Sequence, residues 1–229
     1  MYSKEELEAR KKLIAVAQKC LEYGLTVGTW GNLSVRLDRE KILITPSGFE
    51  KSALKPEHLL VVNLDGVVLK GELKPSVETW LHTAIYKARE DVNAVIHTHS
   101  PYATLFASVN EPIPVITVDF AAAVGHEVPV TKYVPPGSKD LAEEVVRVLG
   151  KDKSVVLIRN HGAVAVGKDL ENAYHAALLL ENEAAVYFRT KLLEKVEEAK
   201  LPLEEVERLH SIFVKAYGQK GGKITLKLE

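Results

Sequence analysis

Apolar residues near the start of the chain recur every three or four positions, which is typical of a helix with one buried face. This spacing predicts an amphipathic helix over residues 3–23. Ser3 can cap its first turn, with Glu6 completing a capping box, and Gly24 is suited to end the helix.

Short apolar runs in the rest of the chain predict strands. The first two pairs are residues 33–37 with 41–45, and residues 59–63 with 67–70. Asp65-Gly66 separates the second pair and is a strong signal for a tight hairpin turn. Later runs predict strands over 94–98, 114–118, 127–134, 154–158 and 163–166.

Helical spacing returns between these strands and predicts helices over 76–90, 102–108, 138–149, 169–195 and 203–217. Strands and helices are interspersed, and tight turns join several neighbouring strands. The chain is therefore predicted to form one layered α/β domain over residues 1–229, with a largely antiparallel or mixed central sheet. It contains no GxGxxG fingerprint and no Walker P-loop, which argues against a nucleotide-binding fold.

Composition narrows the class of protein without changing this fold. The net charge is −1, with 30 basic and 31 acidic side chains, so no basic excess indicates a nucleic-acid partner. Cys20 is the one cysteine and cannot form an internal disulfide, which fits a reducing compartment. No apolar run approaches the roughly 18 residues of a membrane span, so a cytoplasmic protein without a membrane partner is expected. Scarce Asn and Gln beside plentiful Lys and Glu favour a thermophilic origin.

Three histidines predict a metal site. His97 and His99 follow the apolar run 94–96, and residues two apart on a strand project from the same face. His161 follows another apolar run, and Gly162 beside it permits close approach of the backbone. Three imidazoles leave a fourth coordination position open, which is the arrangement of a catalytic zinc ion. Histidines that merely end two strands are the alternative interpretation.

A carboxylate and several polar turns add to this site. Glu78 is expected in the first turn of a helix, where the helix dipole alone could explain it, and His82 one turn later is expected to be a structural partner. Residues 28–34 and 45–48 are rich in glycine and hydroxyl groups, and such turns can bind a phosphate through backbone N–H groups. Ser76 at a helix start could contribute. Each turn alone is more often only a turn, and Lys51 and Lys74 nearby are expected to be solvated.

The chain resembles the class II aldolase/adducin family in the order of five motifs: GNLS at 31–34, TPSG at 45–48, KPSVE at 74–78, HTH at 97–99 and NHG at 160–162. The resemblance spans residues 7–217, and fuculose-phosphate aldolases are enzymatic members of this family. It implies a single three-layer α/β/α domain that assembles as a homotetramer with active sites at subunit interfaces.

The resemblance also implies roles for individual residues. His97, His99 and His161 match the ligands of one Zn²⁺ per subunit, and Glu78 matches the catalytic glutamate. The phosphate pocket of the substrate, a small phosphorylated sugar, matches Gly31, Asn32, Ser47, Gly48 and Ser76, with Val77 where fuculose-phosphate aldolases carry a second serine. Tyr217 matches a tyrosine that reaches the substrate.

One departure from the family concerns the proton donor. Fuculose-phosphate aldolases carry a tyrosine from the neighbouring subunit in the stretch that matches 113–120, and this sequence has none there. Asp119 is the nearest group able to carry a proton, and related ribulose-phosphate epimerases carry an aspartate in this neighbourhood.

The function expected from this resemblance is a zinc-dependent lyase that cleaves a ketose 1-phosphate, such as L-fuculose 1-phosphate, to dihydroxyacetone phosphate and an aldehyde. A ribulose-phosphate 4-epimerase or a methylthioribulose-1-phosphate dehydratase of the same superfamily would carry a similar metal and phosphate site. An adducin-like binding module without catalysis is disfavoured because His97, His99, His161 and Glu78 are all present. A metal-dependent hydrolase of unrelated fold is disfavoured by the ordered polar turns.

Overall fold

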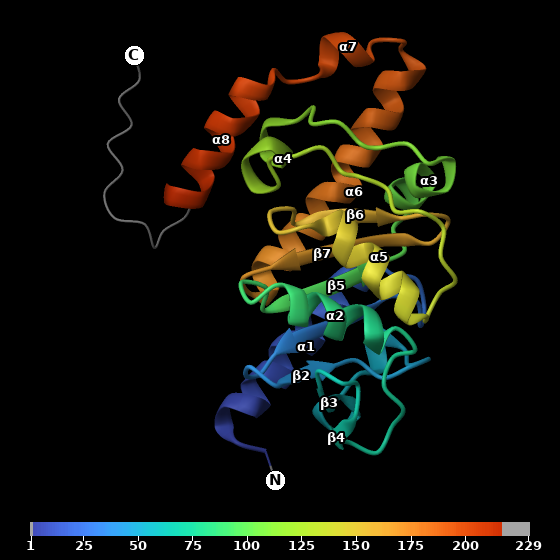
Figure 1. The fold of residues 1–229 in the computed structure, drawn as a ribbon, viewed down its shortest axis with the longest axis vertical. Coiled ribbons are helices and arrows are strands. Elements are labelled where there is room, and N and C mark those ends of the chain that lie inside the picture. Colours follow the sequence, from blue (N-terminus) through green and yellow to red (C-terminus); the bar gives the residue numbers. More distant parts are fainter. Residues whose placement is uncertain (1, 217–229) are drawn as a thin grey trace.

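The computed structural model describes residues 2–216 and contains one seven-stranded sheet (Figure 1). Its strands are β1 (Asn32–Arg36), β2 (Lys41–Ile44), β3 (Leu60–Asn63), β4 (Val68–Lys70), β5 (Ala94–Thr98), β6 (Val155–Ile158) and β7 (Gly162–Gly167). They lie in the order β4-β3-β2-β1-β5-β7-β6, and every neighbouring pair is antiparallel. The antiparallel sheet confirms the predicted α/β fold class.

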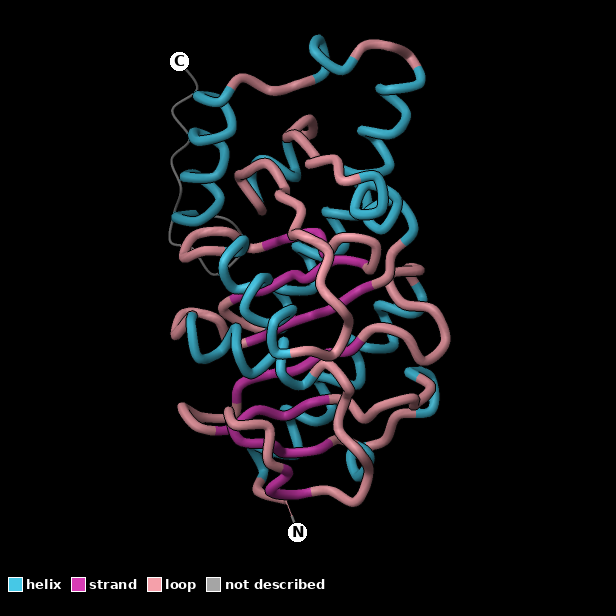
Figure 2. Tube along the Cα trace, turned by 45° about the vertical axis from the view of Figure 1, so that its right-hand side comes forward, coloured by secondary structure: helices cyan, strands magenta, loops and turns pink. Residues whose placement is uncertain are grey.

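Helices cover both faces of this sheet (Figure 2). They are α1 (Lys4–Glu22), α2 (Thr79–Ala88), α3 (Pro101–Val109), α4 (Val118–Ala123), α5 (Lys139–Leu149), α6 (Leu170–Leu192), α7 (Val196–Ala199) and α8 (Leu203–Ala216), with the short 3₁₀ turns η1 (Lys51–Ala53) and η2 (Pro56–His58). None of the helices in the described part of the chain is long and apolar enough to cross a membrane.

The side chains of the strands alternate between two hydrophobic clusters, one on each face of the sheet. On β5, Ala94 and Ile96 belong to the cluster formed with α1, α3, α4 and α6, whereas Val95 belongs to the cluster formed with α2 and α5. Both faces are thus buried, which explains why the strands read as continuous apolar runs. The period of two also places His97 on the same face as Val95, toward α2.

Side-chain caps begin several of the predicted helices. Ser3 Oγ accepts a hydrogen bond from Glu6 N at 3.1 Å and begins α1, and Ser138 Oγ accepts one from Leu141 N at 3.1 Å and begins α5. Gly150 ends α5 with a positive φ. The caps predicted at Ser3, Ser138 and Gly150 are confirmed. The Glu6 carboxylate binds Arg10 and Lys70 rather than the Ser3 backbone of a capping box.

The strands predicted over 114–118 and 127–134 are wrong. Ile113, just before the first segment, forms an isolated bridge with Val128, and Val130 forms another with Leu157 of β6. Residues after 117 form α4 instead. The buried Glu183 carboxylate on α6 accepts hydrogen bonds from Ile116 N at 2.5 Å, and from Thr117 N and Oγ1 at 3.1 and 2.6 Å. These backbone donors therefore bind a side chain rather than a neighbouring strand.

The helix predicted over 76–90 is shorter than expected and leaves Glu78 outside it. Ser76 Oγ accepts a hydrogen bond from Glu78 N at 3.2 Å, and Ser76 O accepts one from Thr79 N at 3.1 Å. This turn delays the start of α2 to Thr79, with Glu78 as the residue before it. Glu78 is consequently positioned by a tight turn rather than by the first turn of the helix.

Candidate metal centre and active site

The register of two antiparallel strands brings the first site residues together. Asn32 on β1 lies directly opposite His97 on β5, and Leu33 lies opposite Ile96. Directly opposed residues of antiparallel strands project from the same face of the sheet. Asn32 and His97 therefore both point toward α2, where Glu78 immediately precedes the first turn.

The three predicted histidines converge at one end of the central strands. His97 is the last residue but one of β5, His99 follows the strand, and His161 lies in the turn between β6 and β7. Their ring centroids are 4.7, 4.8 and 4.9 Å apart, so the imidazoles form a nearly equilateral triangle. His161 reaches this position because Asn160 adopts a left-handed conformation with φ 56°, and because β7 follows immediately.

Gly162 is required where β7 approaches β5. A Cβ at this position would lie 2.2 Å from the Thr98 carbonyl oxygen and 3.4 Å from the His97 ring. No side chain fits at 2.2 Å from a backbone oxygen, so only glycine allows the strand to pass this close. The residue beside His161 therefore sets the distance between two ligands of the cluster.

Glu78 completes the cluster. Its Oε2 lies 3.2 Å from His97 Nε2, and its Oε1 lies 3.3 Å from His161 Nε2. The ligand atoms of Glu78, His97, His99 and His161 all lie within 4.8 Å of one another. Glu78 is 5% exposed, so a buried carboxylate faces the open centre of a histidine triangle.

These residues fit a divalent metal ion. His97 Nδ1 donates to the Ala163 carbonyl at 2.9 Å, which leaves the lone pair of its Nε2 facing His99 Nε2, 2.9 Å away. An outer hydrogen bond of this kind is typical of a metal-ligating histidine. Imidazole nitrogens this close together beside a carboxylate can all be held by one cation, which takes the place of a shared proton. The buried Oε1 of Glu78 also has no hydrogen-bond donor among the described residues.

The electrostatics of the cluster agree with this interpretation. Burial and the charge of His97 lower the pKa of His99 to about 3 and that of His161 to about 4, so both are neutral at pH 7. Burial would raise the pKa of Glu78, but the positive charge of His97 and a hydrogen bond from it lower this pKa well below its usual range. Conversely, Glu78 raises the pKa of His97 against the effect of burial.

A chain of buried hydrogen bonds fixes the orientation of Glu78. Asn32 Nδ2 donates to Glu78 Oε2 at 2.8 Å, and Asn32 Oδ1 lies 2.5 Å from His82 Nε2. His82 Nδ1 lies 2.6 Å from Ser34 Oγ, which lies 2.9 Å from Tyr86 Oη. Burial lowers the pKa of His82 to about 3, so it is neutral and has the predicted structural role.

Three of the predicted phosphate-binding residues, Gly31, Asn32 and Ser76, lie beside this cluster. Gly31 adopts φ 78°, and a Cβ there would lie 2.8 Å from the His97 carbonyl oxygen and 2.7 Å from Thr26 Cγ2. The segments around Ser47 and Ser76 lie side by side, because Ser47 N donates a hydrogen bond to Lys74 O at 2.9 Å and Pro46 forms a bridge with Pro75. Ser47 and Gly48 are exposed, whereas Ser76 is buried.

Two neighbouring residues were not predicted as parts of the site. Lys51 was expected to be solvated but is 1% exposed, and its Nζ donates to the Thr29 carbonyl at 2.9 Å. Trp30 is 65% exposed, and its ring centroid lies 5.7 Å from that of His99. Only the position of Trp30 within a glycine-rich segment, and of Lys51 three residues after one, could have indicated that they lie near the histidines.

Asp119, the predicted proton donor that lies within the described residues, is not part of the cluster. Asp119 lies exposed in the first turn of α4, and the metal-binding group contains Glu78 and the three histidines alone among the described residues. Tyr217 lies outside the described residues. The described part of the chain therefore brings together the predicted metal ligands and Glu78 but not Asp119.

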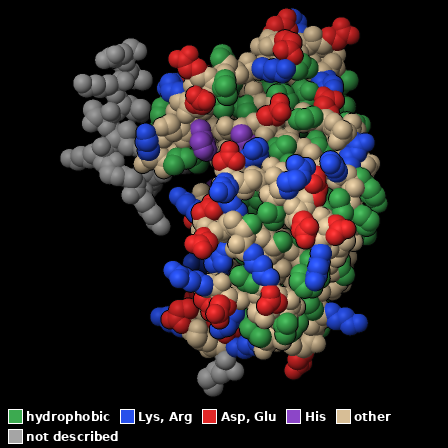
Figure 3. All heavy atoms as spheres, in the orientation of Figure 1, with side chains coloured by type: hydrophobic (Ala, Val, Ile, Leu, Met, Phe, Trp, Pro, Cys, Tyr) green, Lys and Arg blue, Asp and Glu red, His purple; other side chains and the backbone are tan. Residues whose placement is uncertain are grey.

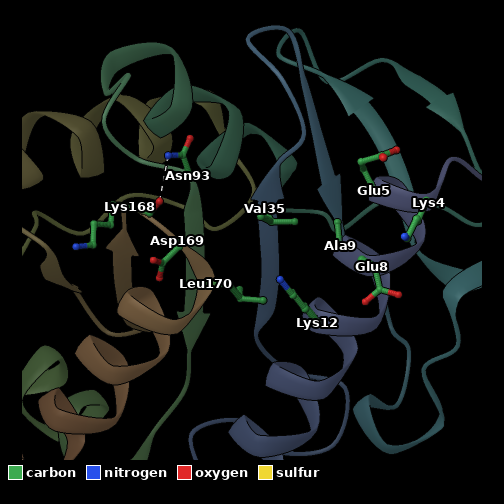
Figure 4. A pocket seen from close by; sticks show the side chains of 10 residues that line it. All are labelled: Lys4, Glu5, Glu8, Ala9, Lys12, Val35, Asn93, Lys168, Asp169 and Leu170. Atoms are coloured by element: carbon green, nitrogen blue, oxygen red, sulfur yellow. Dashed lines mark hydrogen bonds between the residues drawn. The ribbon is translucent and has the colours of Figure 1, made fainter. Parts of the chain in front are cut away.

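Residues 2–216 contain no second group of potential metal ligands of this kind. A cavity of about 550 Å³ lies at the opposite end of the central strands, where Val35, Asn93 and Lys168 line it together with residues of α1 (Figure 4). Lysines and carboxylates alternate around this cavity, and no group of like charges points to one position. On the face shown in Figure 3, acidic and basic side chains are likewise interspersed, without a broad basic patch.

Comparison with known families gives one match that covers most of the chain. Residues 11–188 match the family described as the Class II Aldolase and Adducin N-terminal domain. This range includes Glu78, His97, His99 and His161. It ends within α6 and therefore before α7 and α8.

Individual proteins give the same result. The chain is 39% identical over 212 residues to a 5-deoxy-D-ribulose 1-phosphate aldolase of Bacillus thuringiensis serovar kurstaki, covering 92% of this chain and 97% of that protein. It is 36% identical over 189 residues to an L-fuculose phosphate aldolase of Methanocaldococcus jannaschii, covering 81% and 99%. A solved L-fuculose 1-phosphate aldolase superposes with a TM-score of 0.86 at 34% identity, covering 93% of this chain and 98% of that one.

Proposed function

Because the chain belongs to the class II aldolase and adducin family, we propose that it is a zinc-dependent aldolase that cleaves a ketose 1-phosphate to dihydroxyacetone phosphate and an aldehyde. The observation that carries this proposal is the buried Glu78 carboxylate between His97 Nε2 and His161 Nε2. A binding module without catalysis has no need for a carboxylate held at this position by an amide.

The donor set favours zinc, with one ion per subunit. Three imidazoles leave a coordination position open, as in catalytic zinc sites. When bound, the ion would act as a Lewis acid that stabilises the negative charge developing on the carbonyl oxygen of the substrate. The remaining steps depend on side chains of this protein.

Glu78 is assigned the proton transfer at carbon. When the bond between C3 and C4 of the ketose breaks, C3 becomes the hydroxymethyl carbon of dihydroxyacetone phosphate and must receive a proton. Glu78 delivers this proton in cleavage and removes it in condensation. The hydrogen bond from Asn32 Nδ2 to Oε2 holds the carboxylate in one orientation, so no reorganisation is needed at the moment of transfer.

The phosphate is assigned to Gly31, Asn32, Ser47, Gly48 and Ser76. The side-chain amide of Asn32 is already hydrogen-bonded to Glu78 and His82, so Asn32 is expected to bind the phosphate through its backbone. Phosphate binding occurs away from the bond that breaks, and its free energy orients the reacting carbons. In cleavage another group must remove the proton of the C4 hydroxyl, and in condensation the same group returns it to the aldehyde oxygen; Asp119, Tyr217 and water are the candidates.

The proposal also includes the assembly and the location of the protein. We infer a homotetramer in which active sites lie at subunit interfaces, so that Asp119 of one subunit could serve a neighbouring site. We also infer a cytoplasmic location. Size-exclusion chromatography with light scattering tests the assembly. A monomer with full activity would contradict the shared site.

The substrate is inferred to be a deoxyketose 1-phosphate. The B. thuringiensis relative is named for 5-deoxy-D-ribulose 1-phosphate, whose cleavage gives dihydroxyacetone phosphate and acetaldehyde. The M. jannaschii relative is named for L-fuculose phosphate, whose cleavage gives lactaldehyde instead. The test offers the zinc-loaded enzyme dihydroxyacetone phosphate with acetaldehyde, lactaldehyde and glycolaldehyde and measures condensation. Absence of product with every aldehyde would exclude the aldolase assignment.

An epimerase or dehydratase is the second candidate, favoured by the absence of a tyrosine in 113–120. Cleavage, inversion and loss of water give different products from the same phosphorylated ketose. Product analysis by NMR therefore distinguishes the three reactions in one experiment.

A further inference from the structure

A buried lysine lies beneath the glycine-rich turn that leads into β1. The Lys51 ammonium on η1 is enclosed, and the Thr29 carbonyl is the hydrogen-bond acceptor that it contacts among residues 2–216. Burying a charged ammonium against one neutral acceptor costs free energy. A charge kept in such a place therefore calls for a function that a neutral side chain could not perform.

The charge of Lys51 persists near neutral pH and reaches the metal centre. Burial lowers the pKa of Lys51 to about 8, and the neighbouring Cys20 and Glu50 oppose this shift, so the ammonium is mostly protonated at pH 7. Lys51 also lowers the pKa of His99, after the larger effects of burial, His97 and His161. The lysine therefore lies close enough to the site to act electrostatically.

Lys51 also determines which way the turn presents its backbone. Because Lys51 is buried, its hydrogen bond holds the Thr29 carbonyl toward the interior. Trp30 N donates back to Val27 O at 3.0 Å, and Gly31 follows with φ 78°. A turn that binds an anion must direct carbonyl oxygens away from it. The residues assigned to the phosphate are all neutral, so they lack a counter-charge of their own.

We propose that Lys51 is a positioning residue of the phosphate subsite, which holds the Thr29 carbonyl inward and supplies a fixed positive charge behind the turn. This inference rests on the proposed function, because it takes the phosphate to bind at the glycine-rich turns. A buried counter-charge acts through low dielectric and is screened by salt less than a surface lysine would be.

The test compares the zinc-loaded wild type with Lys51→Met, which keeps the shape of the side chain but removes the charge. Lys55→Met is the matched control, because Lys55 lies four positions further along and is exposed. Calorimetry measures the Kd of inorganic phosphate. Lys51→Met should raise this Kd roughly tenfold, the order expected for one partly screened charge, and Lys55→Met should leave it unchanged. A Kd for Lys51→Met within twofold of the wild type would overturn the proposal.

Stability separates this role from a merely structural one. Removing a buried charge should leave the Tm of Lys51→Met equal to or above that of the wild type, whereas a structural lysine would lower the Tm and leave the Kd of phosphate unchanged. Should Lys51→Met fail to fold, Lys51→Gln keeps a donor for Thr29 and is judged by the same Kd. In condensation, Lys51→Met should raise the KM for dihydroxyacetone phosphate and spare kcat with unphosphorylated dihydroxyacetone. An equal loss of kcat/KM with dihydroxyacetone phosphate and with dihydroxyacetone would refute the assignment of Lys51 to the phosphate subsite.

The phosphate titration also distinguishes this inference from the proposed function. A wild type that binds phosphate but forms no aldol product would exclude the proposed reaction and still measure the effect of Lys51. A wild type that forms product, with a phosphate Kd insensitive to Lys51→Met, would overturn only the role of the lysine.

Discussion

Asn32 and Glu78 are joined by a 2.8 Å hydrogen bond in which the amide donates to the carboxylate, although 46 positions separate them in sequence. The amide is itself oriented by His82, whose Nε2 lies 2.5 Å from Asn32 Oδ1. The proposed catalytic carboxylate is thus held by a group that belongs to the strand opposite His97. This dependence leads to the first prediction.

Asn32→Asp should reduce kcat without releasing the metal. It replaces the donor to Glu78 with an oxygen, so two carboxyl groups compete for one buried site and Glu78 turns away. A misplaced catalytic group costs roughly 100-fold in rate. Steady-state kinetics and metal analysis check this. Ser34→Ala breaks the same chain of hydrogen bonds at His82, two bonds further from Glu78, and should reduce kcat less. An unchanged kcat in Asn32→Asp would show that the hydrogen bond from Asn32 to Glu78 is dispensable.

Glu78→Gln should retain zinc and lose turnover. Glutamine fills the same space but cannot exchange the proton, and removal of a general base reduces rates roughly 10²- to 10⁴-fold. The three histidines remain to hold the ion. Glu72→Gln, an exposed substitution nearby, is the control. Full activity of Glu78→Gln would remove Glu78 from the mechanism.

Zinc binding to the metal-free protein should release about one proton near pH 6. His99 and His161, with pKa values of about 3 and 4, are already neutral, whereas the pKa of His97 is raised above its usual value by Glu78. Metal affinity is therefore fully developed above the pKa of His97 and falls as the pH decreases through it. Calorimetry in buffers of different ionisation enthalpy counts the protons. Release of nearly three would contradict these pKa values.

His97→Ala should lose the metal altogether. His97 is the ligand whose Nδ1 is fixed by the Ala163 carbonyl, so its loss removes the best oriented of the three. Chelation of the wild type should likewise abolish activity, and added zinc should restore it. Stoichiometric zinc in purified His97→Ala would show that the site is built differently.

Gly162→Ala should weaken both the sheet and the metal site. The new Cβ would meet the Thr98 carbonyl at 2.2 Å, so β7 must move away from β5 and carry His161 with it. Overpacking of this kind lowers the free energy of unfolding by about 1–3 kcal/mol. Urea denaturation measures the stability, and competition with a chelator measures the zinc affinity. Wild-type values of both would mean that the strands accommodate the methyl group.

The sequence predicted the convergence of the three histidines because each comes after an apolar run, 94–96 for His97 and His99 and 155–158 for His161. Periodicity and a neighbouring glycine are local signals, and they were sufficient for His97, His99 and His161. The role of Asn32 depends on the register between β1 and β5, which no local pattern encodes. Lys51 follows exposed Glu50 and precedes exposed Ser52, so its burial could not be predicted from its neighbours. The false strand at 114–118 has a similar cause, because Glu183 lies far away in sequence.

The indole of Trp30 lies beside His99, so its fluorescence can report on the histidine cluster. The chain has two tryptophans, and the second, Trp80 on α2, has the Lys139 ammonium 4.2 Å from its ring centroid. Loading the site with paramagnetic Co²⁺ or Cu²⁺ should quench the emission of Trp30 more strongly than that of Trp80. Fluorescence of the unlabelled protein can therefore follow occupancy of the site in real time, with no substrate present.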